Sequence, residues 1–185
     1  YSTVSNLSYM LIAVALMTGS ALNAALMHMM FHALAKIVLF CCAGAVFYVT
    51  GREYIYQLHG CGRRMPITFT CFTFTALGLI GVPPLGNFTS KWLICTSAME
   101  VGSFWAYFAA MSLMFSTLLT ALYLLSVIIP AWFPTDEKIV RDGRLPHDPH
   151  ALMTAPMILI AALYAVLSLY SSGIGEMLQS FIKAV

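Results

Sequence analysis

Two histidines and a lysine recur at intervals of four residues within one mostly apolar stretch. His28, His32 and Lys36 all lie within residues 21–49. Each step of four residues advances about 400° around an α-helix, so the three side chains share one face over about 12 Å. Imidazole gains and loses its charge near physiological pH. A stripe of two imidazoles and an amine is therefore suited to passing protons along a helix.

Other chemistry is open to the same stripe. Histidines at positions i and i+4 can share a metal ion, but Met29 stands where the zinc-protease pattern has glutamate. Haem ligation is a second alternative, although no matching histidine pair occurs at similar depth on another segment. Plain hydrogen bonding between helices is a third. We expect a proton relay, with no metal and no cofactor held by this chain.

A second lysine, Lys91, follows a disruption in a long apolar stretch. Residues 66–99 are too many for one straight span, and Pro83, Pro84 and Gly86 lie near their middle. Proline lacks the amide donor and clashes with the preceding turn, so two in a row should break the helix. Non-helical backbone at membrane depth is tolerated only where it is buried in protein or lines a watery cavity. A kink that serves only packing is the alternative.

Lysines inside apolar helices are unfavourable unless something compensates them. A charge at the bilayer centre costs about 2.5–3.5 kcal/mol on insertion scales. Snorkelling toward the headgroups is the alternative explanation, but Lys36 and Lys91 both lie near the middle of their segments. We therefore predict that both take part in proton transfer. Lys91 would be a gate whose charge responds to hydration and to neighbouring charges.

The elements that must position these side chains are membrane helices. Of the 185 residues, 61% are hydrophobic and 9% are charged, with mean hydropathy +0.86, whereas soluble domains carry roughly 25% charged residues. A span needs about 20 apolar residues. The sequence predicts an all-α membrane protein of about five transmembrane helices, the third broken at Pro83-Pro84, with a short amphipathic tail. The predicted segments are residues 1–18, 21–49, 66–99, 104–129 and 151–170.

The remaining polar and aromatic residues carry weaker signals. The five cysteines form no CxxC pair and read as small hydrophobic residues. Glu100 reads as an interfacial residue, and the charges of the loop 130–150 as solvated. No quinone, flavin, nucleotide or iron–sulfur motif occurs, so any redox chemistry would belong to partner proteins. Belt or packing roles are expected for Tyr9, Tyr48, Tyr123, Trp92 and Trp105.

The distribution of Lys and Arg predicts an orientation. The loop 51–65 carries three of them and the loop 130–150 another three, whereas the opposite side has only Lys183. By the positive-inside rule both long loops are expected in the cytoplasm and the C-terminus outside.

Four ordered motifs resemble one family. YSTVSNLSYM is similar to its YS-T-x-S-x-x-G-Y segment, with Ser8 where glycine is usual, and HMMFHALAKIVLF to its H-x-x-x-H-x-x-x-K helix. LHGCGRRMP resembles its L-G-G-L-x-R-x-M-P loop, and GLIGVPPLGNFTSKW its broken helix. The chain thus resembles the antiporter-like proton-translocating membrane subunits of respiratory complex I, of membrane-bound hydrogenases and of the Mrp sodium/proton antiporters. The motifs cover residues 1–93; beyond them the resemblance rests on hydropathy.

The resemblance implies a fold and a role. The family has fourteen core helices with two inverted five-helix repeats, and this chain resembles the tenth to fourteenth. We therefore expect a single transmembrane domain that is the C-terminal part of a larger subunit, in a bacterial or archaeal inner membrane. Lys91 matches the broken-helix lysine near the outward exit, and His28, His32 and Lys36 match the central polar axis. The other half-channel would lie in the missing half.

The implied function is proton translocation through a half-channel of a multi-subunit membrane complex. Its expected partners are other hydrophobic subunits, membrane lipid, protons and, for an antiporter, sodium. Nucleic acid is not an expected partner. Either a redox-driven pump or a gradient-driven antiporter fits, and the sequence GVPPLGNFTSKW slightly favours the D-type antiporter subunit and its hydrogenase relatives. A membrane-embedded haem or metal-binding protein and a non-conducting scaffold are the alternatives.

Overall fold

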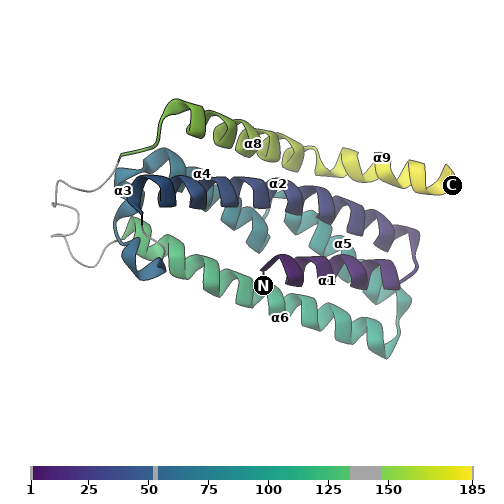
Figure 1. Ribbon diagram of the computed structural model, residues 1–185. Helices are drawn as coiled ribbons and strands as arrows, with labels where there is room; N and C mark the ends of the chain where they lie inside the picture. The colour runs from purple at the N-terminus through teal and green to yellow at the C-terminus, as the bar shows by residue number, and fades with distance from the viewer. Residues whose placement is uncertain (1, 52–53, 134–146, 185) are drawn as a thin grey trace.

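The described part of the chain is a bundle of helices. The computed structural model describes residues 2–51, 54–133 and 147–184, and no strand occurs within them. The all-α prediction is therefore confirmed. The helices in chain order (Figure 1) are α1 (Ser2–Ala15), α2 (Gly19–Thr50), the 3₁₀ turn η1 (Ile55–Gln57), α3 (Cys61–Arg64), α4 (Pro66–Ile80), α5 (Gly86–Val101), α6 (Phe104–Trp132), α8 (Ala151–Leu169) and α9 (Ser171–Ala184).

Helix α2 is the centre of the bundle. It packs against α1, α4, α5, α8 and α9, and Figure 1 shows α8 and α9 along one side of it, with α1 and α6 on the other. Small side chains such as Ala21, Ala24, Ala35 and Ala45 are buried along its length, which allows neighbouring helices to approach closely. The stripe that begins at His28 is therefore enclosed by several helices.

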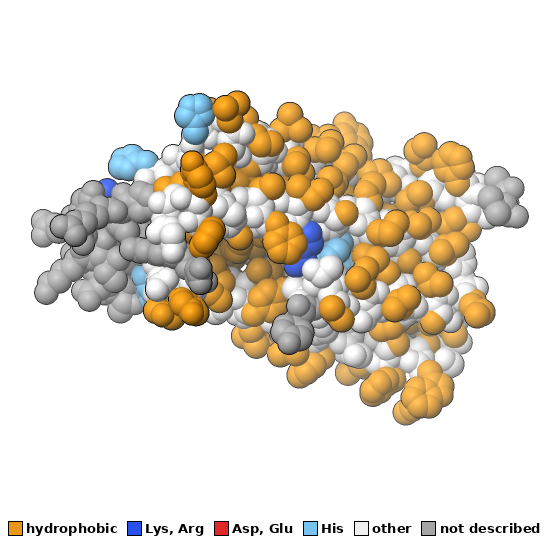
Figure 2. All heavy atoms as spheres, viewed as in Figure 1, with side chains coloured by type: hydrophobic (Ala, Val, Ile, Leu, Met, Phe, Trp, Pro, Cys, Tyr) orange, Lys and Arg blue, Asp and Glu red, His pale blue; other side chains and the backbone are white. Residues whose placement is uncertain are grey.

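The surface of the bundle is that of a membrane protein. α2, α6 and α8 are long and apolar enough to cross a bilayer, and α1 and α4 are shorter apolar helices. Helix α6 exposes large apolar side chains such as Phe104, Trp105, Phe108 and Phe115, and the face in Figure 2 is mostly hydrophobic. The chain is a multi-pass all-α membrane protein. The predicted number of five spans is not established by these helix lengths.

The predicted break in the third segment is present. α4 ends at Ile80, and α5 begins only at Gly86. Gly81 adopts a left-handed conformation with φ 99°, and its N–H donates to the Leu77 carbonyl at 3.1 Å. This ending suits glycine, which has no Cβ to clash. The break therefore spans the Pro83-Pro84 pair, as the sequence predicts.

Two glycines next to the break allow side chains from other helices to fit against it. A Cβ built on Gly86 would collide with the ring of Phe31 from α2, and one on Gly78 would collide with the phenol of Tyr164 from α8. Phe31 and Tyr164 are themselves in edge-to-face contact, with ring centroids 6.2 Å apart. Bare backbone at these two positions is what lets α2 and α8 close around the broken helix.

One end of the bundle gathers segments that are distant in sequence. The Gly60 N–H donates to the Pro130 carbonyl at 3.1 Å, which ties the loop before α3 to the end of α6. Asp148 accepts from the backbone N–H groups of Ile67 and Thr68 at 3.2 and 3.1 Å. A carboxylate at a helix N-terminus is favourable. Asp148, one of the loop charges expected to be solvated, is half-buried and caps α4.

Several other charged residues lie outside the described part of the chain. They are Lys138, Arg141 and Arg144 within residues 134–146, together with Arg52 and the side chain of Lys183. The predicted tail after the last apolar segment is a helix, α9, which contacts α2 through a 2.9 Å hydrogen bond from Asn23 Nδ2 to the Gly175 carbonyl.

Candidate functional site

His28 lies at the meeting point of three helices. Its ring is fully buried, with Nδ1 2.9 Å from Ser90 Oγ of α5 and Nε2 3.2 Å from Asn6 Oδ1 of α1. Asn6 is in turn held by a 2.8 Å hydrogen bond from its Nδ2 to the Ser2 carbonyl. Both imidazole nitrogens are therefore engaged with fixed neighbours.

This geometry can hold His28 in two protonation states. Because Asn6 donates to Ser2 through Nδ2, its Oδ1 faces the imidazole as an acceptor, so Nε2 must carry a hydrogen. The Ser90 hydroxyl has a single hydrogen and two acceptors in reach, His28 Nδ1 and the Asn87 carbonyl at 3.1 Å. It donates to a neutral imidazole, and turns to Asn87 when Nδ1 is protonated. His28 can gain a proton without movement of heavy atoms.

His32 stacks on His28 one turn further along α2. The two rings are nearly parallel, with centroids 6.1 Å apart and an interplanar angle of 14°. His32 is 5% exposed, and neither of its ring nitrogens has a hydrogen-bond partner among the described residues. Buried polar atoms in proteins are almost always partnered, and ordered water is the usual partner when protein supplies none. Water next to His32 would continue the line.

Lys36 completes the stripe at a more open place. The residue is half-buried, its Nζ donates to Ser2 Oγ at 3.0 Å, and Ser2 Oγ lies 2.6 Å from the Tyr123 hydroxyl of α6. A neighbouring cavity of about 280 Å³ is lined by Ser2, Ser5, Ser116, Leu119, Thr120 and Tyr123. Hydroxyl groups therefore surround this end of the line.

Lys91 is enclosed at the helix break. It is 6% exposed, and its Nζ donates to the carbonyls of Leu79 and Ile80, both at 3.0 Å. These carbonyls belong to the last turn of α4, where a helix attracts positive charge. The lysine on α5 thus stabilises the end of α4 across the break. Its side chain also lines a cavity of about 270 Å³ between α5 and α6, with Cys95 one turn away.

Tyr9 fills the space between Lys91 and His28. Lys91 Nζ lies 5.8 Å from the centre of the Tyr9 ring, and that ring is 5.8 Å from the His28 ring in an edge-to-face arrangement. The Tyr9 hydroxyl donates to Ser116 Oγ at 2.5 Å. A row of five side chains therefore runs through the bundle, with ring contacts from Lys91 through Tyr9 and His28 to His32, and with Lys36 one turn beyond His32 on α2. We call these five residues the polar line.

The structure brings together every side chain that the sequence singled out for proton transfer, and adds others. Of the tyrosines expected in belt or packing roles, Tyr9 does pack in the core, and both its hydroxyl and that of Tyr123 are also hydrogen-bonded. Asn6 and Ser90 were not singled out. Their signal was weak: Asn6 lies in the polar first half of its segment, and Ser90 directly precedes Lys91.

The arrangement does not resemble a metal or haem site. Within the described residues, no group of three or more His, Cys, Asp or Glu side chains converges. The nitrogens of His28 face Ser90 and Asn6, and its ring is nearly parallel to that of His32, so the two imidazoles do not point at a common centre. Hydrogen bonding and proton exchange suit this geometry better than ligation.

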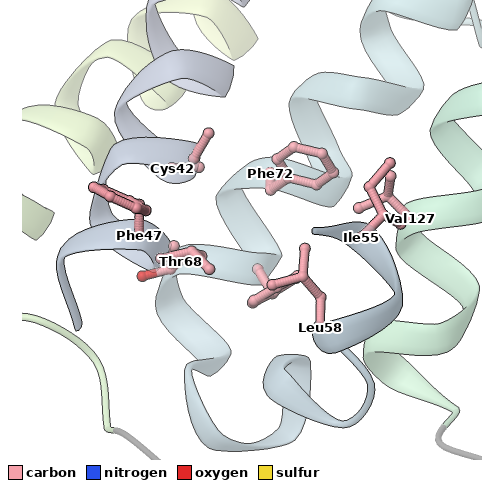
Figure 3. Close-up of a pocket in the computed structure, with 10 residues that line it drawn as sticks. Cys42, Phe47, Ile55, Leu58, Thr68, Phe72 and Val127 are labelled. Carbon is pink, nitrogen blue, oxygen red and sulfur yellow. The ribbon is translucent and has the colours of Figure 1, made fainter. Parts of the chain in front are cut away.

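A separate cavity of about 420 Å³ lies near the loop end of the bundle (Figure 3). Phe47 of α2, Leu58 beside η1, Phe72 of α4 and Val127 of α6 surround it, and Thr68 is one of its few polar neighbours. None of the polar-line residues lines it. This cavity is therefore separate from the polar line.

Comparison with known proteins agrees with the resemblance in the motifs. The profile of the family described as NADH:quinone oxidoreductase/Mrp antiporter, transmembrane, matches residues 1–120. NADH-quinone oxidoreductase subunit N of Desulforudis audaxviator is 33% identical over 183 residues, covering 94% of this chain and 36% of the relative. Subunit L of Rickettsia typhi is 36% identical over 163 residues, covering 88% of this chain and 24% of the relative.

Solved structures share the fold. A chain of the Mrp complex from Dietzia sp. superposes with a TM-score of 0.83 at 21% identity, covering 98% of this chain and 41% of that one. A chain of the archaeal membrane-bound sulfane sulfur reductase gives 0.74 at 24% identity, covering 89% and 32%. This chain spans about a third or less of the curated relatives named above. By the match over residues 1–120, the chain belongs to the NADH:quinone oxidoreductase/Mrp antiporter transmembrane family.

Proposed function

We propose that this chain carries protons through part of an antiporter-like subunit, along the polar line from Lys36 to Lys91. The observation that carries the proposal is the pair of lysines within the helix bundle, with buried tyrosine and histidine side chains between them. Charges at such depth are unfavourable and usually mark an ion pathway. Membership of the family supports the same function.

Lys91 is suited to the role of gate. As an ammonium it has three N–H groups, and two of them serve the carbonyls of Leu79 and Ile80. The neutral amine still has two N–H groups, so losing the third proton leaves both carbonyls partnered. Lys91 can therefore release a proton without unravelling the end of α4. The adjoining cavity of about 270 Å³, whose lining includes Thr96 and Thr117, is the proposed exit for that proton.

The histidines supply the middle of the route. His28 accepts a proton at Nδ1 when the Ser90 hydroxyl turns away, and its stacked neighbour His32 has free nitrogens for water. Lys36 joins this pair to the hydroxyls of Ser2 and Tyr123. We propose that protons enter from the side of Lys36 and His32 and leave past Lys91. No step in this route needs a cofactor in this chain.

We further propose the setting of the chain. It would be one of several hydrophobic subunits of a complex in a bacterial or archaeal plasma membrane. The loops 51–65 and 130–150 would face the cytoplasm and the C-terminus the outside. The hydrogen bond from Gly60 to the Pro130 carbonyl supports placing both loops at one end of the bundle. Iron–sulfur clusters in the gently purified complex would favour a redox-driven pump, and their absence with sodium-dependent flux would favour an antiporter.

Proton flux through the reconstituted complex tests the proposal. The complex that contains this chain is placed in liposomes with a pH-sensitive dye, and wild type is compared with Lys91→Ala. We expect an assembled Lys91→Ala complex to lose flux. Cys95→Ser, which changes the same cavity but no charge, is the matched control and should retain flux. Wild-type flux in the assembled Lys91→Ala complex would refute the proposal and favour a scaffold role.

A further inference from the structure

Polar groups without partners gather on the side of the helix break that faces α8. The side-chain amide of Asn87 and the hydroxyls of Tyr164 and Ser168 have no hydrogen-bond partner among the described residues. Asn87 and Tyr164 are 0% exposed, and Ser168 is 2% exposed. None of the three belongs to the polar line. The polar line therefore does not satisfy these buried polar groups.

These groups come from elements that meet at the break. Asn87 is the second residue of α5, and Tyr164 and Ser168 are one turn apart on one face of α8. The Tyr164 hydroxyl points at Gly78, in the last turn of α4. Ser168 and the backbone of Asn87 both lie within interaction range of the Tyr164 hydroxyl. The hydroxyls of Tyr164 and Ser168 therefore lie together beside the first turn of α5, which carries Asn87.

The rings around Tyr164 hold its hydroxyl in this position. Its ring packs edge-to-face against Phe31 and Phe74, with both centroid distances 6.2 Å. Because Asn87 and Tyr164 are fully enclosed by this chain, side chains of other subunits or of a longer chain cannot reach them. A partner for these groups must be small enough to be enclosed with them.

Water meets that requirement. Buried waters in proteins typically join about three otherwise unsatisfied polar groups, and an amide alone offers two donors and an acceptor. We propose that ordered water bound by Asn87, Tyr164 and Ser168 links the helix break to α8. We call this place the α8 water site. The α8 water site lies off the polar line, not along it.

The α8 water site is connected to the polar line through the first turn of α5. Ser90 Oγ lies 3.1 Å from the Asn87 carbonyl and 2.9 Å from His28 Nδ1. Water held by the Asn87 side chain would therefore lie at the same turn that carries Ser90 and precedes Lys91. In this arrangement Tyr164 is a positioning residue, which acts on the polar line through water and through Asn87.

X-ray radiolytic labelling of the intact complex tests for this water. X-rays split bound water into hydroxyl radicals, which label the side chains next to it, and mass spectrometry locates the labels. Met157 is the internal control, because it is also 0% exposed but packs in an apolar cluster with Val38 and Cys42. We expect several-fold more labelling of Tyr164 than of Met157. Labelling of Tyr164 at or below that of Met157 would overturn the proposal.

Two variants sharpen the test. Ser168→Ala removes one hydroxyl and Asn87→Leu replaces the amide with an apolar group of similar size, and each should lower Tyr164 labelling several-fold. Ser168→Ala is the milder change and keeps the test decisive if Asn87→Leu does not assemble. Unchanged Tyr164 labelling in assembled Ser168→Ala complexes would count against the site. Because labelling is read without proton flux, its outcome is independent of the function proposed for the polar line.

Discussion

The two lysines of the polar line differ in how completely this chain surrounds them. Lys91 is buried, and its ammonium donates to two backbone carbonyls that cannot move without unwinding α4. Lys36 is half-buried and donates to one hydroxyl, that of Ser2, beside an open cavity. The environment of Lys91 is built by the helix break itself, whereas that of Lys36 depends on flexible side chains at a groove.

The difference assigns different demands to the two positions. At Lys91 the shape of the site and the ability to lose a proton both matter, because the amine must keep two carbonyls partnered in both charge states. At Lys36 the hydroxyls and the open cavity beside the side chain leave room for water to carry the proton past a fixed charge. Substitutions at the two ends should therefore have unequal effects.

Arginine in place of each lysine gives the largest expected difference. Arginine keeps the charge but does not lose its proton in proteins, and its planar head is larger. We expect Lys91→Arg to abolish proton flux, whereas Lys36→Arg retains a measurable part because its site is open and charge is preserved. Flux measured in liposomes for both assembled variants is the test. Equal flux in the two variants, or the reverse order, would contradict the comparison.

Overfilling the Lys91 end should destabilise the protein without touching either lysine. A Cβ at Gly86 would collide with the Phe31 ring, whereas nothing lies within 4 Å of one at Gly44. Overpacking typically costs about 1–3 kcal/mol, so Gly86→Ala should lower the thermal unfolding midpoint. Gly44→Ala is the matched control and should leave it unchanged or higher. If Phe31→Leu does not restore part of the loss in Gly86→Ala, the collision is not its cause.

The two histidines should differ in the same sense, by a smaller amount. His28→Ala leaves Asn6 and Ser90 without their shared partner, and an unsatisfied buried polar group costs about 1–3 kcal/mol. His32→Ala leaves no described hydrogen-bond partner behind. Thermal unfolding should therefore show the larger loss for His28→Ala, while both variants slow proton flux. A larger loss of stability for His32→Ala would show that the hydrogen bonds of His28 contribute little.

The fold follows from the sequence more fully than the site does. Apolar length and the proline pair predict the helices and the break, because hydropathy and proline geometry act locally. Spacing by four likewise places His28, His32 and Lys36 on one face. The number of spans is less certain from sequence, because α1 and the two halves at the break are short.

The sequence does not predict which groups the site residues contact, because those contacts depend on how the helices pack. The contact of Tyr9 with both Lys91 and His28 joins α1, α2 and α5, and the acceptors of Lys91 are backbone carbonyls, which any residue can offer. In the sequence Asp148 is simply a charged loop residue. Its capping role appears only when the segment before α8 packs against the start of α4. Such long-range contacts leave no periodic pattern in the chain.

Chemical restoration of the amine at position 91 tests the central claim most directly. In the Cys95→Ser background, Lys91→Cys is made, the complex is assembled, and the thiol is alkylated with bromoethylamine through the adjoining cavity of about 270 Å³. The product is an amine of nearly the length of lysine, and mass spectrometry confirms its formation. We predict that Lys91→Cys lacks proton flux and that alkylation restores it. Normal flux before alkylation, or none after complete alkylation, would contradict the role of Lys91 as the proton gate.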